Sequence, residues 1–312
     1  MGIFLVFFLF SVWSVVFPLG KYALLYSSPI FITGARMTFA GLLLLAYLYF
    51  RKKLPPLSKK QLFSLFLLAL FSIYITNILE FWGLAHLSAA KTCFLYSLTP
   101  FVAALLSYIH FKEKMTPGKW MGMLIGSLGF IPVLLDKSGT ESLFDTIFFF
   151  SLPELAVFGA VFFSTYGWIL LRLVVKDNQI SPPVANGISM FIGGTLALFT
   201  SFFTDSWNPL PFDSSATFPL VGTLLVITLI SNILCYNLYG YLLKKYTATF
   251  LSFFGLLSPL FASFHSWILI GEPPSLPILL SSPIVILGLF LIHREELRQG
   301  YISSNTLTKS TS

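Results

Sequence analysis

The sequence predicts an all-α membrane protein of ten transmembrane helices, arranged as two inverted five-helix repeats around a central cavity. Three observations predict this fold class: an apolar composition, ten long apolar segments and an internal repeat. Of the 312 residues, 56% are hydrophobic and only 10% are charged. A water-soluble surface needs about a quarter of the residues to be charged. We therefore expect most of the outer surface to face a lipid bilayer.

The apolar segments are each close to the length of about 20 residues that crosses a bilayer. They lack the alternating pattern of barrel strands, so helices must satisfy the backbone hydrogen bonds within the lipid. The first segment has no basic leader or small-residue cleavage site, and we expect it to be a permanent span. The ten segments are 3–24, 30–50, 62–84, 90–111, 118–135, 153–174, 184–204, 217–242, 247–270 and 275–293.

Lys and Arg residues are distributed unequally between the two sides that ten spans define. Fifteen of the 19 lie on the side of the termini, whereas only Lys21, Lys91 and Lys137 lie on the other side and Arg36 lies within a span. The positive-inside rule then predicts a multi-pass protein of the cell inner membrane with cytoplasmic N- and C-termini. Because the basic residues form short clusters between helices, we expect no nucleic-acid partner.

An internal repeat relates the two halves. At an offset of 159 residues Pro100 aligns with Pro259 and Glu113 with Glu272, and nearer the start of each half an offset of 153 aligns Gly41 with Gly194. Five helices is an odd number, so the second repeat must enter the membrane in the opposite orientation, a basis for alternating access. The expected organisation is a first repeat 1–136, an outward-facing linker 137–152, a second repeat 153–295 and a cytoplasmic disordered tail 296–312.

Several motifs resemble those of the EamA type of the drug/metabolite transporter superfamily, over nearly the whole chain. They are Trp13, Lys21, Pro29 and Arg36; Ser88-Ala89-Ala90, Leu98-Thr99-Pro100-Phe101 and Glu113-Lys114; and Leu257-Ser258-Pro259-Leu260-Phe261-Ala262 with Gly271-Glu272-Pro273. The resemblance implies a carrier with a central cavity and no cofactor. Ser189 stands where the second repeat would match Arg36, so we expect a chemically asymmetric cavity.

Within that superfamily the Phe-rich, basic sequence is most similar to S-adenosylmethionine transporters of obligate intracellular bacteria. This similarity implies a secondary active transporter that exchanges S-adenosylmethionine for S-adenosylhomocysteine. Two alternatives stay open: an exporter of amino acids or related metabolites, and a membrane-embedded lipid-modifying enzyme. The enzyme would need clustered acids or histidines, whereas the acids here are scattered. Metal-ligand spacing is also lacking, and the oligomeric state is left open.

Ionisable side chains within the hydrocarbon are costly and therefore point to function. Arg36 lies in the second span and is a candidate anchor for a substrate carboxylate or phosphate, or else a structural partner of an acid or of freed carbonyls. Glu80 lies near the outer end of the third span, with Asn77 and Tyr74 preceding it at i−3 and i−6. This face is a candidate for binding a cationic group. Alternatively, Glu80 reaches the hydrated outer interface.

Further candidates are amide and aromatic side chains. Asn232, Tyr236 and Tyr239 lie with Cys235 at i, i+4, i+7 and i+3 of the eighth span, where they either line the cavity or bond a neighbouring helix. Additional aromatic walls for an adenine ring would come from Trp13, Trp82, Tyr96, Tyr166 and Trp168.

Two prolines are candidate hinges because each removes a backbone hydrogen bond within its helix. Pro100 and Pro259 would leave the carbonyls of Tyr96 and Gly255 in need of other partners.

Overall fold

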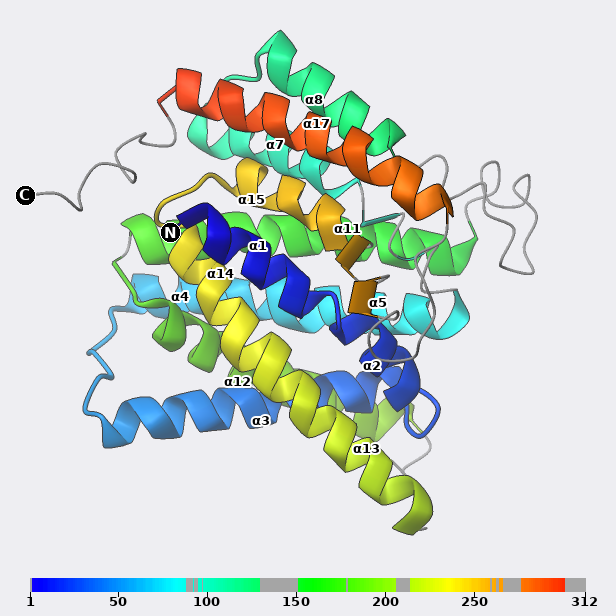
Figure 1. The fold of residues 1–312 in the computed structure, drawn as a ribbon. Coiled ribbons are helices and arrows are strands. Elements are labelled where there is room, and N and C mark those ends of the chain that lie inside the picture. The colour runs from blue at the N-terminus through cyan, green and yellow to red at the C-terminus, as the bar shows by residue number, and fades with distance from the viewer. Residues whose placement is uncertain are drawn as a thin grey trace, which may run out of the picture. The chain divides into compact units, whose positions relative to one another are not determined.

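The computed structural model describes residues 2–87, 92, 95–96, 98–129, 151–177, 179–205, 214–258, 260–261, 264–265 and 276–300. This described part is helical and contains no strand (Figure 1). The chain divides into two compact units. Unit 1 comprises Met1–Val15, Cys93–Phe150 and Lys245–Ser312, and unit 2 comprises Val16–Thr92 and Ser151–Lys244. Each unit therefore draws helices from both halves of the sequence.

The helices of unit 1 are α1 (Gly2–Trp13), α7 (Thr99–Phe111), α8 (Pro117–Leu128), α15 (Ala248–Phe254), the 3-10 helix η4 (Gly255–Leu257) and α17 (Leu276–Arg298). Those of unit 2 are α2 (Val16–Ala23), α3 (Pro29–Phe50), α4 (Lys59–Leu68), α5 (Thr76–His86), α11 (Leu152–Arg172), α12 (Pro182–Thr204), α13 (Ser214–Ile227) and α14 (Tyr236–Leu242). Unit 2 also contains the π-helical segments η1 (Ala69–Ile75), η2 (Leu173–Asp177) and η3 (Thr228–Cys235).

Six helices of the described residues are long and apolar enough to cross a membrane. They are Ile3–Ala23, Pro29–Phe50, Lys59–His86, Leu152–Lys176, Pro182–Thr204 and Ala216–Leu242. Shorter apolar helices, Thr99–Phe111 and Ala248–Leu257, fall in the predicted fourth and ninth spans, and α8 and α17 fall in the fifth and tenth. The predicted tail was placed from residue 296, but α17 continues as a helix to Arg298.

Hydroxyl side chains mark where several helices begin. Ser28, Ser58, Thr116 and Thr247 each accept a hydrogen bond from the backbone N–H three residues later. Such N-caps satisfy amide groups that a helix leaves unpaired at its start. Pro follows in the first turn of α3 and α8, where its missing N–H costs no bond.

Helices α3 and α12 pack closely in unit 2, and their contacts are reciprocal. A Cβ at Gly41 would lie 2.7 Å from the Phe191 Cα, and one at Gly194 would lie 2.7 Å from the Thr38 Oγ1. An offset of 153 residues relates Gly41 to Gly194 and Thr38 to Phe191. The contact of Gly41 with Phe191 therefore corresponds to the contact of Gly194 with Thr38 when the two helices are exchanged. Gly34 with Leu198, and Gly187 with Leu45, repeat this relation. Residue numbers fall along α12 as they rise along α3, so the two helices are antiparallel.

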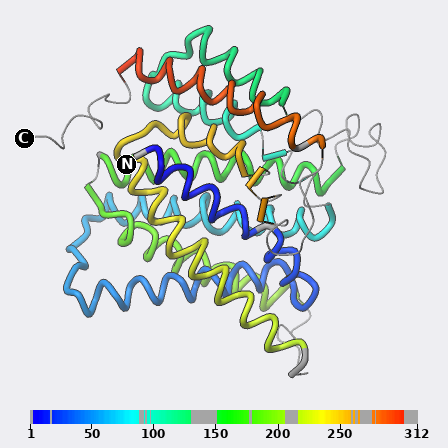
Figure 2. The backbone as a smooth tube through the Cα atoms, viewed as in Figure 1, coloured from blue at the N-terminus to red at the C-terminus, as the bar shows by residue number. Residues whose placement is uncertain are grey.

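Helices α8 and α17 of unit 1 run side by side (Figure 2), and their contacts show the same relation at the offset of 159. A Cβ at Gly129 would lie 2.9 Å from the Val285 Cγ2, and one at Gly288 would lie 2.7 Å from the Gly126 N. The offset relates Gly129 to Gly288 and Gly126 to Val285, so the two contacts correspond to each other when the helices are exchanged. These two helices are also antiparallel, because the contacts of Gly122 with Ile292 continue the same opposed numbering.

The π-helical segments η1 and η3 begin at Ala69 and Thr228, again 159 residues apart. A π-segment inserts one extra residue into a helical turn and leaves backbone carbonyls without their usual amide partners; such segments are frequent at functional sites. In both halves the residues that follow the π-segment include the polar candidates of the sequence: Asn77 and Glu80 after η1, and Tyr236 and Tyr239 after η3.

The predicted hinge at Pro100 has a different setting from the one expected. Helix α7 begins at Thr99, so Pro100 occupies its first turn rather than a helix interior. The Tyr96 carbonyl accepts a hydrogen bond from the Thr99 hydroxyl (2.6 Å). In the second half the Gly255 carbonyl accepts the N–H of Ser258 at the end of η4. Pro259 lies outside the described residues.

Candidate functional site

The Arg36 side chain is buried in unit 2, with 3% of its surface exposed. Its Nη2 donates a hydrogen bond to the Asn77 Oδ1 (2.5 Å). The guanidinium carbon also lies 4.6 Å from the centre of the Phe81 ring, and such a cation–π contact is strongest when both groups are desolvated. Phe81 is itself buried. The guanidinium is therefore fixed both along one edge and over one face.

Asn77 follows directly from the π-segment η1. Its Nδ2 lies 3.1 Å from the Ser72 carbonyl oxygen and 2.8 Å from that of Ile73, and donates to both. Both carbonyls belong to the π-segment. The neighbouring Thr76 hydroxyl donates to the Phe71 carbonyl (2.7 Å). Side chains thus satisfy the backbone where the helix departs from α geometry.

Tyr236 brings the second half of the chain to the same place. Its side chain is hydrogen-bonded with Asn77 and lies within electrostatic reach of Arg36 and Glu80. Tyr236 is buried, whereas Glu80 is half-buried. We call Arg36, Asn77, Glu80 and Tyr236 the polar cluster; its residues come from α3, α5 and α14. Asn77 and Tyr236 are 159 residues apart, which is the offset of the predicted repeat.

An aromatic wall adjoins the polar cluster through Tyr236. The Trp168 ring of α11 lies 4.1 Å from the Tyr239 ring with an interplanar angle of 34°. It lies 5.1 Å from the Tyr236 ring at 50°. Trp168, Tyr236 and Tyr239, which we call the aromatic wall, form a connected π surface of the kind on which a planar heterocycle can stack.

Three other predicted residues of unit 2 make contacts apart from this cluster. Tyr74 is hydrogen-bonded with Thr200 of α12 (2.7 Å), so the face predicted to join it to Asn77 and Glu80 is divided by the π-turn. Trp82 packs against the exposed His86, with ring centres 4.5 Å apart. Asn232 is fully buried in η3, and its Nδ2 donates to the Met37 Sδ (2.8 Å).

The remaining predicted residues belong to unit 1. Trp13 stacks on Phe10, with ring centres 6.3 Å apart, and Tyr96 lies half-buried just before α7. Sequence reasoning did not select Phe81 at all, and named Trp168 only among several possible walls. The chain contains 35 Phe residues, so no aromatic residue stands out by type; only the spacing of Phe81 one turn after Asn77 offered a signal.

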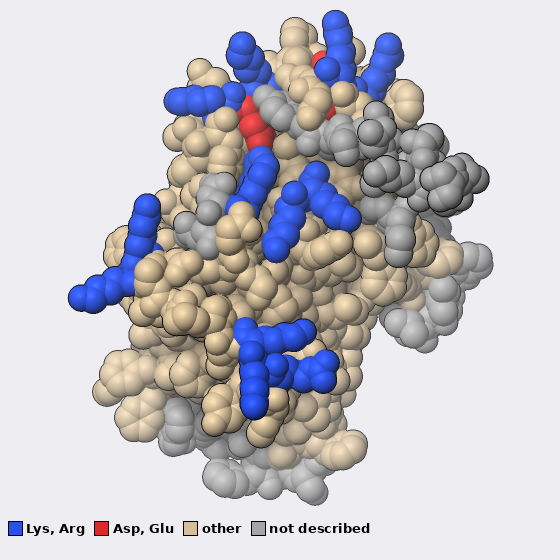
Figure 3. Space-filling model, turned by 90° about the vertical axis from the view of Figure 1, so that its left-hand side faces the viewer, with Lys and Arg blue, Asp and Glu red and all other residues tan. Residues whose placement is uncertain are grey.

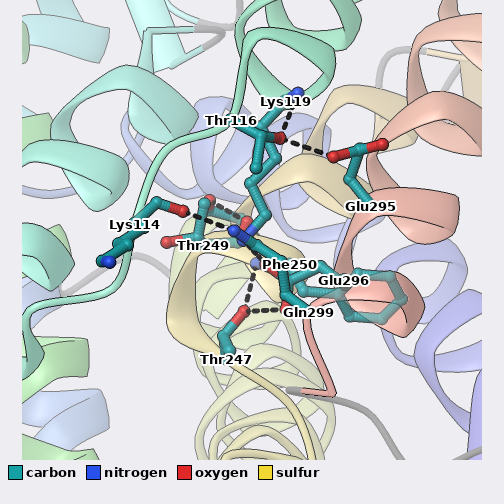
Figure 4. Close-up of polar contacts among 10 residues, drawn as sticks. Lys114, Thr116, Lys119, Thr247, Thr249, Phe250, Glu295, Glu296 and Gln299 are labelled. Atoms are coloured by element: carbon teal, nitrogen blue, oxygen red, sulfur yellow. Dashed lines mark hydrogen bonds and ion pairs between the residues drawn. The ribbon is translucent and has the colours of Figure 1, made fainter.

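Unit 1 contains a second set of polar contacts, at the end of α17 (Figure 4). Lys119 and Glu296 form an ion pair, and both side chains are buried. The Thr247 hydroxyl donates to the Glu296 Oε2 (3.0 Å), while that of Thr116 donates to the Glu295 Oε2 (2.7 Å). Burial raises the pKa of Glu296, and Lys119 opposes that shift. This network ties α8, α15 and α17 together.

No group of three or more His, Cys, Asp or Glu residues suited to a metal ion occurs among the described residues. The polar cluster instead offers a cation, a carboxylate, hydrogen-bonding groups and rings. That set suits non-covalent binding of a small zwitterionic or nucleoside-like molecule.

Comparison with known proteins gives the context for this site. The EamA-like transporter family model matches residues 1–135 and 151–294. A protein named S-adenosylmethionine/S-adenosylhomocysteine transporter from Chlamydia muridarum (strain MoPn / Nigg) is 40% identical over 98% of this chain and 95% of its own length. Its namesake from Chlamydia trachomatis serovar L2 is 39% identical over 97% and 92%.

More distant similarities extend across the same length. An uncharacterised transporter of Archaeoglobus fulgidus is 25% identical over 91% of this chain and 95% of its own length. A crystal structure aligns with a TM-score of 0.72 at 14% identity, over 95% of this chain and 97% of that one, and so shows a shared fold. The family is one of transporters, which sets the lipid-modifying enzyme aside. This multi-pass membrane chain belongs to the EamA-like transporter family.

Proposed function

We propose that the chain takes up S-adenosylmethionine in exchange for S-adenosylhomocysteine by alternating access. The relatives that bear this name are about 40% identical to it over nearly the whole chain. The observation that carries the proposal is local: in one region of unit 2 a buried guanidinium, a carboxylate and an aromatic wall lie together.

The chemistry of the ligand matches these groups one by one. S-adenosylmethionine carries a carboxylate, an ammonium, a sulfonium and an adenine ring, and each buried charge needs a partner. Arg36 binds the carboxylate, because a fixed guanidinium suits a two-pronged contact. Glu80 attracts the cationic end. The aromatic wall stacks on the adenine and offers a cation–π contact to the sulfonium.

Alternating access requires an outward-open and an inward-open state that the symmetry of the repeats relates. The ligand cavity lies between the two repeats. The reciprocal contacts within the α3–α12 and α8–α17 pairs support this arrangement. Exchange of contact partners is what a two-fold axis produces. Because the paired helices are antiparallel, that axis crosses them rather than running along them, as expected of inverted repeats. The equivalent positions of η1 and η3 add to this support.

The orientation that we propose places both termini in the cytoplasm of a bacterium and the chain in its inner membrane. Residues 51–53, directly after α3, and residues 59–60, at the start of α4, are basic and exposed. Figure 3 views the side on which α3 ends, and Lys and Arg side chains gather there with few carboxylates among them. Such positive segments are retained on the cytoplasmic side.

Competition binding on the purified protein tests the substrate. Labelled S-adenosylmethionine should bind and should be displaced by S-adenosylhomocysteine, whereas an aromatic amino acid should not displace it. Displacement by the amino acid without displacement by the nucleoside ligands would contradict the proposal, and would favour the amino-acid exporter.

A further inference from the structure

We infer that Asn77 is a positioning residue: it ties the π-segment η1 to Arg36 and so fixes the guanidinium for the ligand, without touching the ligand itself. This inference rests on the proposed function, in which Arg36 binds the carboxylate. It departs from the expectation that Asn77 is a direct ligand contact.

The first argument is the hydrogen-bonding capacity of the amide. An Asn side chain has two N–H donors and an oxygen with two lone pairs, and therefore makes four hydrogen bonds at most. Both N–H donors of Asn77 are used by the carbonyls of Ser72 and Ile73, and its oxygen accepts from the Arg36 guanidinium. These three bonds leave one lone pair of the oxygen, so the amide has little capacity left for a ligand. Asn77 is also buried, with 2% of its surface exposed.

The second argument is the rigidity of the backbone to which Asn77 is anchored. Two glycines from neighbouring helices press against η1. A Cβ at Gly193 of α12 would lie 2.7 Å from the Ala69 carbonyl oxygen, and one at Gly167 of α11 would lie 2.7 Å from the Ser72 Oγ. The two glycines let α11 and α12 approach η1 closely, so the π-turn is held between these helices.

The third argument is the orientation of Arg36. Its guanidinium is held along one edge by the Asn77 oxygen and over one face by the Phe81 ring. Two-pronged recognition of a carboxylate depends on the plane of the guanidinium, and sites of this kind need a supporting layer of contacts. Removal of the Asn77 side chain would leave the charge of Arg36 in place, but the plane of the guanidinium would no longer be fixed.

The test compares two ligands on purified variants. S-Adenosylhomocysteine carries the amino-acid carboxylate, whereas 5′-methylthioadenosine has the same nucleoside without that part. Asn77→Leu should weaken binding of S-adenosylhomocysteine about tenfold or more, the effect of one charged hydrogen bond, and should change binding of 5′-methylthioadenosine much less. The matched control is Thr76→Val, which removes the adjacent side-chain cap on the Phe71 carbonyl but no contact to Arg36. This control should weaken the binding of both ligands equally, or the binding of neither.

A double-mutant cycle separates positioning from direct contact. In an Arg36→Met background, Asn77→Leu should cause no further loss of S-adenosylhomocysteine binding, because the residue acts through Arg36. Additive losses would overturn the inference in favour of a direct ligand contact, and equal losses for both ligands in Asn77→Leu would reduce the residue to a structural role. If Asn77→Leu does not fold, Asn77→Ser, which is too short to reach Arg36, takes its place. Failure of the wild type to bind either ligand would contradict the proposed function instead.

Discussion

Glu80→Gln replaces a carboxylate by an amide of nearly the same shape, and so removes a negative charge without opening a cavity. The two proposed ligands differ in a charge of the opposite sign. S-Adenosylmethionine has a sulfonium where S-adenosylhomocysteine has an uncharged sulfur. If Glu80 faces the cationic end, the substitution should lower the affinity for S-adenosylmethionine more than that for S-adenosylhomocysteine.

The size of this effect follows from the half-buried setting of Glu80. Two unit charges about 4 Å apart attract by about 1 kcal/mol in bulk water and by about 4 kcal/mol near a protein surface. A half-buried carboxylate lies between these limits, so we expect a difference of about 1–3 kcal/mol between the two ligands. This corresponds to a selective loss of about 5- to 150-fold.

Isothermal titration of both ligands into wild type and Glu80→Gln measures the difference. The matched control is Glu154→Gln, the same substitution at a buried glutamate that accepts the backbone N–H of Ser151 at the start of α11. It should leave the ratio of the two affinities unchanged. A Glu80→Gln variant that keeps the wild-type ratio, or that weakens both ligands equally, would refute the assignment of Glu80 to the cationic end.

Four further predictions test other parts of the account. Arg36→Lys should lower uptake of labelled S-adenosylmethionine about tenfold or more although the charge is kept, because the two-pronged contact is lost; unchanged uptake would contradict the carboxylate assignment. Lys119→Met should destabilise the protein by about 3–5 kcal/mol, and addition of Glu296→Gln should restore much of the loss, as seen in thermal unfolding in detergent; an equally unstable double variant would argue against a buried pair. Gly41→Val should lower the melting temperature by forcing apart α3 and α12, at a cost of about 1–3 kcal/mol or more; an unchanged melting temperature would rule out the close packing. A single cysteine at Lys53, in a variant without native cysteines, should resist labelling from outside the cell; outside labelling would reverse the proposed orientation.

The sequence predicted those site residues that contrast with their surroundings. Arg36 and Asn77 are polar side chains within apolar spans, where burial has a high cost, and both belong to the polar cluster. Trp168 and Phe81 offer no such contrast in a chain with 17% aromatic residues. Their contribution depends on which rings the packing brings together. Trp82 and Trp168 were both among the predicted aromatic walls, yet Trp82 packs on His86.

The π-segments were beyond the reach of helical periodicity. Spacings of i−3 and i−6 assume a regular α-helix, and on that assumption Tyr74 shares a face with Asn77 and Glu80. The extra residue of η1 turns Tyr74 toward Thr200 instead. The π-segment packs closely against glycines of other helices, at positions 167 and 193, and local sequence does not reveal such contacts. The predicted repeat rests on prolines and glycines at constant offsets, the residues most constrained by backbone geometry and close packing.

Exchange is the central claim, and a counterflow measurement in proteoliposomes tests it most directly. Vesicles with the purified protein would be preloaded with S-adenosylhomocysteine, with 5′-methylthioadenosine or with buffer, and uptake of labelled S-adenosylmethionine would be followed. The account predicts rapid uptake only into vesicles preloaded with S-adenosylhomocysteine. Uptake at the same rate into buffer-filled vesicles, or no uptake under any loading, would contradict it.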